Sequence, residues 1–232
     1  QKEAYWSLMK IAGQYRGAFL CDGVGLGKTF VGLMLIERLV RDKKHVVLFA
    51  PKGAKEGVWI PLLKQLLPHI FSEDFSNLAI FSHTDLQREG FKERFKRISE
   101  IADAFVIDEA HHFRNRGQTG EMDTWEKRSR YWGLFDTMGG SPKQAFLLTA
   151  TPINNRLTDF RHMIELFTRG EEAFFARSLG INNLRSYFSR LEKDLRGRLG
   201  DAADNLSENL GEAQEVLEHE RLFRELLLQR SR

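Results

Sequence analysis

The chain predicts a three-layer α/β fold with a mostly parallel sheet. Three observations carry this prediction: apolar runs alternate with helical patterns, a glycine-rich segment follows the first run, and an acidic pair follows the fourth. The apolar runs are short and uninterrupted, as in strands that are buried on both faces of a sheet. Strand and helix in alternation favour helices on both sides of that sheet.

Each element of this fold has its own signal in the sequence. Apolar runs predict strands at residues 17–20, 45–50, 78–81, 104–107 and 144–148. Helical spacing predicts helices at residues 29–41, 59–67, 85–98 and 125–138. Pro51 ends the second strand, and Pro61 fits a helix only near its first turn. The predicted architecture is a RecA-like domain.

From residue 156 onward we expect no further strands. Apolar residues recur at helical spacing in two groups: Leu157, Phe160, Met163, Ile164 and Phe167, and then Leu206, Leu210, Ala213 and Leu217. This pattern predicts a domain at residues 1–170 and a helical extension at residues 171–232 that packs on it.

Composition limits the class of protein. The 232 residues are 42% hydrophobic, which is enough for a core and excludes a disordered chain. Net charge is +3, and the basic surplus lies in residues 1–170, where a polyanion-binding face is therefore expected. Cys21 is the only cysteine, which excludes an internal disulfide and a cysteine-rich zinc site. With no apparent membrane span or signal peptide, we expect a cytoplasmic protein. The first residue is not methionine, so we expect a fragment of a longer chain.

The glycine-rich segment predicts a phosphate-binding loop. It joins an apolar run to a helical pattern and reads Asp22-Gly23-Val24-Gly25-Leu26-Gly27-Lys28-Thr29. Amides of the first helical turn can receive phosphate oxygens, Lys28 adds a positive charge, and the Thr29 hydroxyl can complete a Mg²⁺ shell. Asp22 stands where the strict phosphate-loop pattern has glycine. The alternative is a glycine turn that only links strand to helix.

The acidic pair strengthens the phosphate-loop interpretation. Asp108 and Glu109 follow the apolar run at residues 104–107, so they lie at the sheet edge where open α/β folds bind ligands. At such a site Asp108 would hold Mg²⁺, and Glu109 would orient or deprotonate the attacking water. Alone, the pair could also serve as a helix N-cap.

The order of these motifs resembles the superfamily 2 helicases, and most closely the Swi/Snf-type branch with its bacterial Swi/Snf-like helicase proteins. Besides the two motifs above, the resemblance rests on these segments: Gln1-Lys2-Glu3-Ala4, Ala50-Pro51-Lys52, Ser82-His83-Thr84, Ala110-His111 and Leu148-Thr149-Ala150-Thr151-Pro152. It implies a DNA-dependent ATPase that translocates on double-stranded DNA. It also implies that this chain is the first of two motor lobes, ending in the connection to the second.

The resemblance assigns roles to individual residues around the nucleotide. Gln1 is similar to the glutamine that reads adenine, although an exposed terminal glutamine is the alternative. The loop of the family is matched by Gly25, Gly27, Lys28 and Thr29. Gly23 differs, because the family usually has an acidic residue at this position. Asp108 and Glu109 match the carboxylates for Mg²⁺ and for water.

Further residues are implied in coupling and in nucleic-acid binding. His111, Thr149 and Thr151 resemble the residues that couple the nucleotide site to the motor surface; the threonines can also cap the helix that follows. The residues expected on the phosphodiester backbone are Pro51, Lys52, Ser82, His83 and Thr84. For the Ser82–Thr84 turn, ordinary turn chemistry is the alternative.

Two basic segments remain. Residues 91–98 are basic and aromatic, but Phe91, Phe95 and Ile98 share one helical face, which favours a cover helix. Arg114 and Arg116 follow the acidic pair and are better placed to meet a phosphate.

The leading hypothesis is an ATP- and Mg²⁺-dependent motor lobe that works on double-stranded DNA with a second lobe of the same protein. One alternative is an RNA helicase of the Asp-Glu-Ala-His type. Another is a module that binds nucleic acid or a partner without turnover. Intact Lys28, Asp108 and Glu109 argue against the last.

Overall fold

A computed structural model describes residues 1–23, 25–71, 77–117, 128–141, 143–150, 157–199 and 219–229. Its centre is a six-stranded parallel sheet with the order β3-β2-β4-β5-β1-β6. The strands are β1 (Gly17–Leu20), β2 (Val46–Ala50), β3 (Leu78–Ser82), β4 (Ala104–Asp108), β5 (Gln144–Leu148) and β6 (Leu227–Leu228). The first five match the predicted strands, and the three-layer α/β fold is confirmed.

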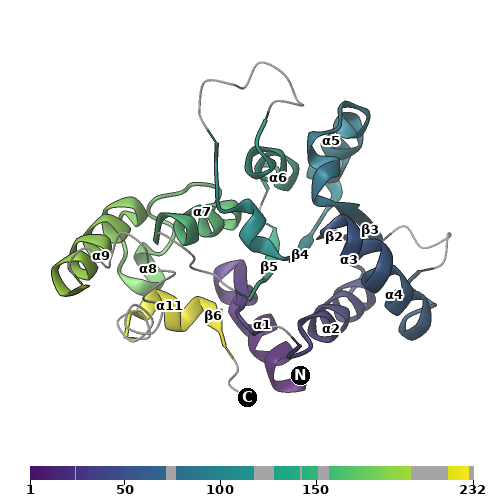
Figure 1. Ribbon diagram of the computed structural model, residues 1–232, viewed down its shortest axis with the longest axis horizontal. Helices are drawn as coiled ribbons and strands as arrows, with labels where there is room; N and C mark the ends of the chain where they lie inside the picture. The colour runs from purple at the N-terminus through teal and green to yellow at the C-terminus, as the bar shows by residue number, and fades with distance from the viewer. Residues whose placement is uncertain are drawn as a thin grey trace.

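Helices cover both faces of the sheet (Figure 1). On one face lie α1 (Lys2–Tyr15), α2 (Lys28–Arg41) and α4 (Ile60–Leu66). The other face carries α5 (Lys92–Ile101), α6 (Arg130–Met138) and α7 (Leu157–Thr168), and α9 (Leu184–Leu199) packs against α7. Each connection between successive strands contains a helix, as a parallel sheet requires.

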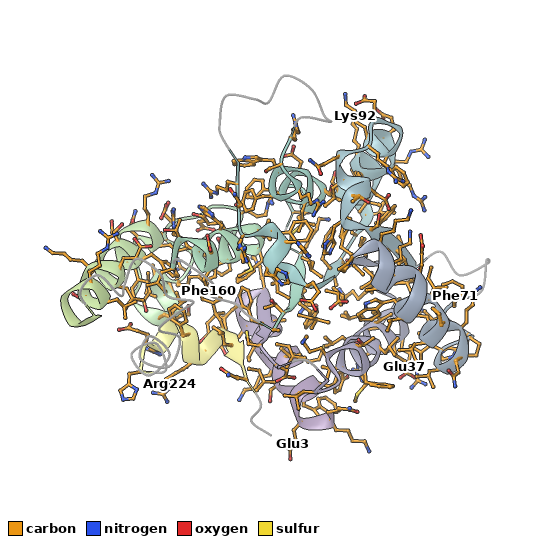
Figure 2. All side chains as sticks on the ribbon, in the orientation of Figure 1. Glu3, Glu37, Phe71, Lys92, Phe160 and Arg224 are labelled. Carbon is orange, nitrogen blue, oxygen red and sulfur yellow. The ribbon has the colours of Figure 1, made fainter. Side chains whose placement is uncertain are left out.

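Alternation along the strands divides the core into two clusters. Phe19, Phe49 and Phe105 point to the side of α5, α6 and α7, whereas Leu20 and Leu48 point to the side of α1 and α2. Figure 2 shows the space between sheet and helices filled with side chains, with Phe160 of α7 in the interior. Because successive strand residues face opposite sides, uninterrupted apolar runs supply both clusters.

The helix that was predicted at residues 59–67 begins seven residues earlier. It runs without a break through α3 (Lys52–Ala54), a π-helical turn at Lys55–Trp59, and α4. The π turn ends two residues before Pro61, which contributes no N–H to the helical ladder. Bonding to a more distant carbonyl at this point lets the helix continue into the proline.

The predicted helix at residues 85–98 is split. Two short 3-10 turns, His83–Gln87 and Glu89–Phe91, precede α5. The reason is a reciprocal cap, in which the Ser82 side chain receives a backbone N–H while the Asp85 side chain receives the Ser82 N–H at 2.8 Å. In α5, Phe95 and Ile98 are buried, so this segment is the cover helix that its apolar face predicts.

The expectation that strands stop after residue 156 is wrong. β6 pairs in parallel with β1, and the Cys21 N–H donates to the Leu228 carbonyl at 2.8 Å. Before β6 come α8 (Ala176–Leu179), α9 and α11 (Arg221–Leu226). Their buried side chains, such as Phe188 and Phe223, share one cluster with Phe19 and Phe160. The division at residue 170 stays a prediction.

Two further predictions fall wholly or partly on residues that the structure does not describe. The apolar group Leu206, Leu210, Ala213 and Leu217, and residues 125–127 of the predicted helix at 125–138, lie outside the described residues. Within the described ranges, no helix has the length and apolar character that crossing a membrane requires.

Candidate nucleotide-binding site

The loop between β1 and α2 has the backbone of a phosphate-binding loop. Gly25 and Gly27 have positive φ angles of 84° and 80°, a conformation that glycine adopts without strain. α2 begins at Lys28, so the amides of its first turn face outward with no carbonyl of their own helix to bond. The Lys28 ammonium donates to the carbonyls of Asp22 at 2.8 Å and Gly23 at 3.4 Å. Val24 lies outside the described residues.

Gln1 lies directly against this loop. A Cβ built at Gly27 would come within 2.6 Å of the Gln1 Nε2 and 3.8 Å of the Phe30 ring. Glycine at this position therefore serves a close approach as well as a positive φ angle. The structure places the Gln1 amide beside the loop, as the resemblance implies for an adenine contact.

Asp108 is a buried carboxylate with a donor on each oxygen. Its Oδ2 accepts the indole N–H of Trp59 at 2.8 Å, and its Oδ1 accepts the Glu109 N–H at 3.0 Å. Burial raises the pKa of Asp108, whereas the Trp59 hydrogen bond lowers it. A buried, ionised carboxylate lowers the stability of the folded protein, and a cation bound at its free lone pairs would restore stability.

Glu109 occupies a strained backbone position at the end of β4. Its φ of 47° places a non-glycine residue in the left-handed region, which costs about 1–3 kcal/mol and occurs chiefly at functional sites. The His111 Nδ1 lies 3.2 Å from Glu109 Oε2, and this hydrogen bond is the main cause that lowers the pKa of Glu109. Glu109 is therefore ionised at neutral pH, as a group that accepts a proton or orients water must be.

His111 connects two strand ends. Its Nδ1 also lies 3.3 Å from the Oγ1 of Thr149, the buried residue that follows β5. The Thr149 N–H donates to the Leu20 carbonyl of β1 at 3.0 Å. Because β5 lies between β1 and β4, Thr149 stands between the phosphate loop and the acidic pair. Thr151 lies outside the described residues.

The charges of the loop and of the acidic pair act on one another. Lys28 lowers the pKa of both Asp108 and Glu109 through its positive charge. In the part of the chain that the structure describes, no group of three or more His, Cys, Asp and Glu side chains could by itself hold a metal. This arrangement fits Mg²⁺, which is held by one or two carboxylates together with substrate phosphates and waters.

The residues predicted on nucleic acid divide into two groups. Lys52 is exposed, and Pro51 and Thr84 are partly exposed, so these three can present groups to a polyanion. Ser82 and His83 are only 3% and 2% exposed, so a phosphate would meet mainly the backbone of this turn, and their contact with nucleic acid stays a prediction. Ser82 is used in the cap with Asp85, and the His83 ring packs 4.8 Å from the ring of Phe113.

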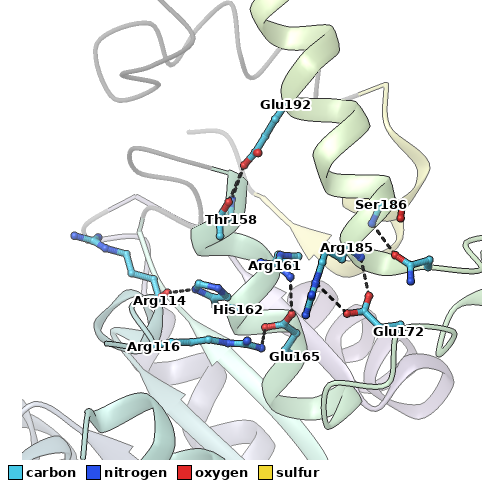
Figure 3. Close-up of polar contacts among 11 residues, drawn as sticks. Arg114, Arg116, Thr158, Arg161, His162, Glu165, Glu172, Arg185, Ser186 and Glu192 are labelled. Atoms are coloured by element: carbon cyan, nitrogen blue, oxygen red, sulfur yellow. Dashed lines mark hydrogen bonds and ion pairs between the residues drawn. The ribbon is translucent and has the colours of Figure 1, made fainter. Parts of the chain in front are cut away.

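Arg116 has an ion-pair partner within the fold, and its contact with a phosphate stays a prediction. It bonds to the buried Glu165 of α7, which also receives Arg161 at 3.0 Å (Figure 3). The guanidinium lies over the ring of Tyr131, 5.2 Å from its centroid. Arg114 keeps about a third of its side chain exposed and lies 3.9 Å from Asp159, so it stays a candidate for phosphate contact.

Trp59 is the main site residue that sequence reasoning missed. Its ring reaches Asp108 from a helix on another part of the chain. The only signal was the position of a large aromatic residue nine places after a predicted strand, and an ordinary core residue gives the same signal.

A glycine-rich loop after the first strand, an acidic pair at the end of the fourth and a parallel sheet between flanking helices make up a RecA-like α/β domain. No protein-family model matches the chain. Over 163 residues it is 28% identical to the uncharacterized ATP-dependent helicase YqhH of Bacillus subtilis (strain 168), an alignment covering 66% of this chain and 26% of the relative. Over 152 residues it is 26% identical to the RNA polymerase-associated protein RapA of Proteus mirabilis (strain HI4320), covering 57% and 15%.

The fold is similar to the Sulfolobus solfataricus SWI2/SNF2 ATPase core in complex with dsDNA. The TM-score is 0.61 at 19% identity, and the match covers 98% of this chain and 43% of that chain. The resemblance to Swi/Snf-type helicase proteins is thereby confirmed. The chain spans less than half of each of these three proteins.

Proposed function

We propose that this chain is the ATP-binding lobe of a Swi/Snf-like, DNA-dependent ATPase that translocates on double-stranded DNA. The observation that carries the proposal is the convergence of Lys28, Asp108 and Glu109 at one edge of the sheet. Relatives described as an ATP-dependent helicase and as RapA, and a structural neighbour bound to dsDNA, support it.

ATP would lie along the loop between β1 and α2. The amides of the first turn of α2 and the Lys28 ammonium would bind the β- and γ-phosphates. The Gln1 amide, beside Gly27, has both a donor and an acceptor for the adenine edge, which favours ATP over GTP. Burial of Lys28 strengthens its attraction to phosphate because little water screens the charge.

Thr29 and Asp108 would hold Mg²⁺ beside the phosphates. When bound, the ion neutralises charge that develops on the phosphate oxygens. The residues of the chain prepare its place: Trp59 and the Glu109 N–H orient the carboxylate, and the Thr29 hydroxyl lies on the first turn of α2.

Glu109 would align the water that attacks the γ-phosphorus. Its carboxylate is held by His111 and is kept ionised, so it can accept a hydrogen bond from that water. Because His111 also contacts Thr149, movements at the phosphates would be transmitted to the end of the neighbouring strand β5. An arginine from a second lobe would stabilise the transition state, an effect of about 10³–10⁵ in rate in nucleotide hydrolases.

The DNA contact would be independent of sequence. Lys52, Pro51 and Thr84 lie after the carboxyl ends of β2 and β3, where backbone amides, hydroxyls and charge can bind phosphates. Such contacts position a duplex without reading its bases, and salt weakens them steeply.

The testing experiment is the Glu109→Gln variant of the complete protein, with duplex DNA present. We expect ATP binding to be kept and turnover to be lost, because glutamine preserves shape but cannot accept a proton. Lys28→Ala should instead lose binding. Turnover by Glu109→Gln at the wild-type rate would refute the role of Glu109.

The same complete protein distinguishes DNA from RNA as the track. Duplex DNA should stimulate its ATPase activity, and the 232-residue chain alone should bind ATP weakly and hydrolyse it little. Stimulation by a tailed RNA duplex, without any by duplex DNA, would assign the protein to RNA helicases. Fast turnover of the 232-residue chain without DNA would contradict the two-lobe mechanism.

A further inference from the structure

Trp59 places a buried hydrogen-bond donor on the most important carboxylate of the site. The residue is 0% exposed, and its Nε1 donates to Asp108 Oδ2 at 2.8 Å. An indole N–H can only donate, and a bond to a charged acceptor in a buried place is about twice as strong as one between neutral groups. The Trp59 side chain therefore does more than fill the core.

The indole ring of Trp59 packs closely against α2 at Gly32. A Cβ built at Gly32 of α2 would lie 2.5 Å from the Trp59 Cη2 and 3.1 Å from the Leu148 Cδ1. The absence of a side chain at Gly32 thus creates the slot that holds the ring. Since α2 begins at Lys28, the ring packs between the helix of the phosphate loop and the end of β4.

The backbone that carries Trp59 is also specialised. Trp59 is the last residue of the π-helical turn at Lys55–Trp59, and such turns are rare and frequent at functional sites. At the first residue of this turn, the Lys55 ammonium lies 3.9 Å from Asp85, whose carboxylate caps the turn after β3. One short helical segment therefore contacts both the turn after β3 and Asp108.

We propose that Trp59 is a positioning residue that fixes the Asp108 carboxylate in the orientation required to hold Mg²⁺ beside ATP. This rests on the proposed function. With Trp59 on Oδ2 and the Glu109 N–H on Oδ1, the carboxylate plane is fixed and one lone pair on each oxygen stays free. Groups that orient a metal ligand in this way commonly contribute about 10–100-fold to metal affinity.

The test measures ATP binding by the 232-residue chain with Mg²⁺ and with EDTA, using calorimetry. Trp59→Phe keeps an aromatic ring but removes the N–H donor together with part of the indole ring system. The matched control is Trp132→Phe, because the buried Trp132 Nε1 has no hydrogen-bond partner among the described atoms. We expect Trp59→Phe to lower affinity about 10-fold or more in Mg²⁺ and to leave it unchanged in EDTA. Trp132→Phe should change neither.

The outcomes separate this inference from the proposed function. If Mg²⁺ strengthens ATP binding equally in wild type and Trp59→Phe, Trp59 has no positioning role and the nucleotide site stands. An equal loss with Mg²⁺ and with EDTA would mean a general packing defect and would also overturn the inference. If the wild-type chain binds no ATP, or binds it without any effect of Mg²⁺, the proposed function fails first.

A second measurement applies if Trp59→Phe does not fold. The chain has four tryptophans, so their indole N–H signals in a ¹⁵N NMR spectrum can be assigned from three other variants. Trp6→Phe, Trp125→Phe and Trp132→Phe each remove one signal and leave that of Trp59. Addition of Mg²⁺ with a non-hydrolysable ATP analogue should shift the Trp59 signal and leave that of Trp132 in place. An unshifted Trp59 signal, with the analogue bound, would refute the inference.

Discussion

Gly32→Ala is the substitution for which the structure gives the clearest opposing effects. Alanine in place of glycine inside a helix stabilises by about 1 kcal/mol. At Gly32, however, the new methyl group would lie 2.5 Å from Trp59, which is itself completely buried. Forcing extra volume into a packed core costs about 1–3 kcal/mol. We therefore expect Gly32→Ala to lower the free energy of unfolding by up to about 2 kcal/mol.

Gly13→Ala is the matched control. Gly13 also lies inside a helix, α1, but a Cβ there meets no atom within 4 Å. This variant should keep the full gain of about 1 kcal/mol, so the two variants should differ by about 1–3 kcal/mol. Thermal unfolding should show the difference as a Tm gap of roughly 2–4 °C for each kcal/mol. A Gly32→Ala protein as stable as Gly13→Ala would refute the account of the Trp59 slot.

Three further predictions concern stability and DNA binding. Arg116→Ala removes one of the two guanidinium partners of the buried Glu165 and should lower the free energy of unfolding in urea by about 2–4 kcal/mol. Arg38→Ala breaks an exposed ion pair and should change this free energy little. Equal losses in the two variants would contradict the contribution of the buried pair. Burial lowers the pKa of His162 to about 4, so as the pH falls the unfolded chain binds a proton before the folded one does. The free energy of unfolding should therefore fall as pH drops from about 6.5 toward 4. In urea titrations, the decrease in the free energy of unfolding between pH 7 and pH 5 should be smaller for His162→Asn than for wild type. Lys52→Ala should reduce the slope of log affinity for duplex DNA against log salt by about 0.9, and an unchanged slope would remove Lys52 from the interface.

The sequence predicts the sheet well where strands are buried on both faces. Residues 46–50 and 104–107 are uninterrupted apolar runs because each strand supplies side chains to both core clusters. β6 lacks this signal, since it has only two residues, Leu227 and Leu228, directly after a helix. Its pairing with β1 depends on tertiary packing, which local periodicity does not encode.

The candidate site is predicted in the same uneven way. Lys28 and Asp108 meet because carboxyl ends of parallel strands share one edge, a rule that needs no coordinates. The fate of Arg116 could not be predicted, because its partner Glu165 lies on a helix far along the chain. Likewise, the sequence of the Ser82–His83 turn does not reveal that both side chains are buried.

Buried polar groups explain why this edge of the sheet is a site and not only a surface. Lys28, His83, Asp85, Asp108 and Thr149 are all buried there, although burying such groups is costly unless they are paired. For Asp85 the cap on Ser82 and the ammonium of Lys55 supply that pairing, so its cost is met within the fold. For Asp108 the pairing is incomplete, because two N–H donors orient the carboxylate but its burial still raises the pKa. Under the proposed function, a desolvated carboxylate beside a lysine and a loop of open amides would gain binding energy from a metal-bound polyphosphate.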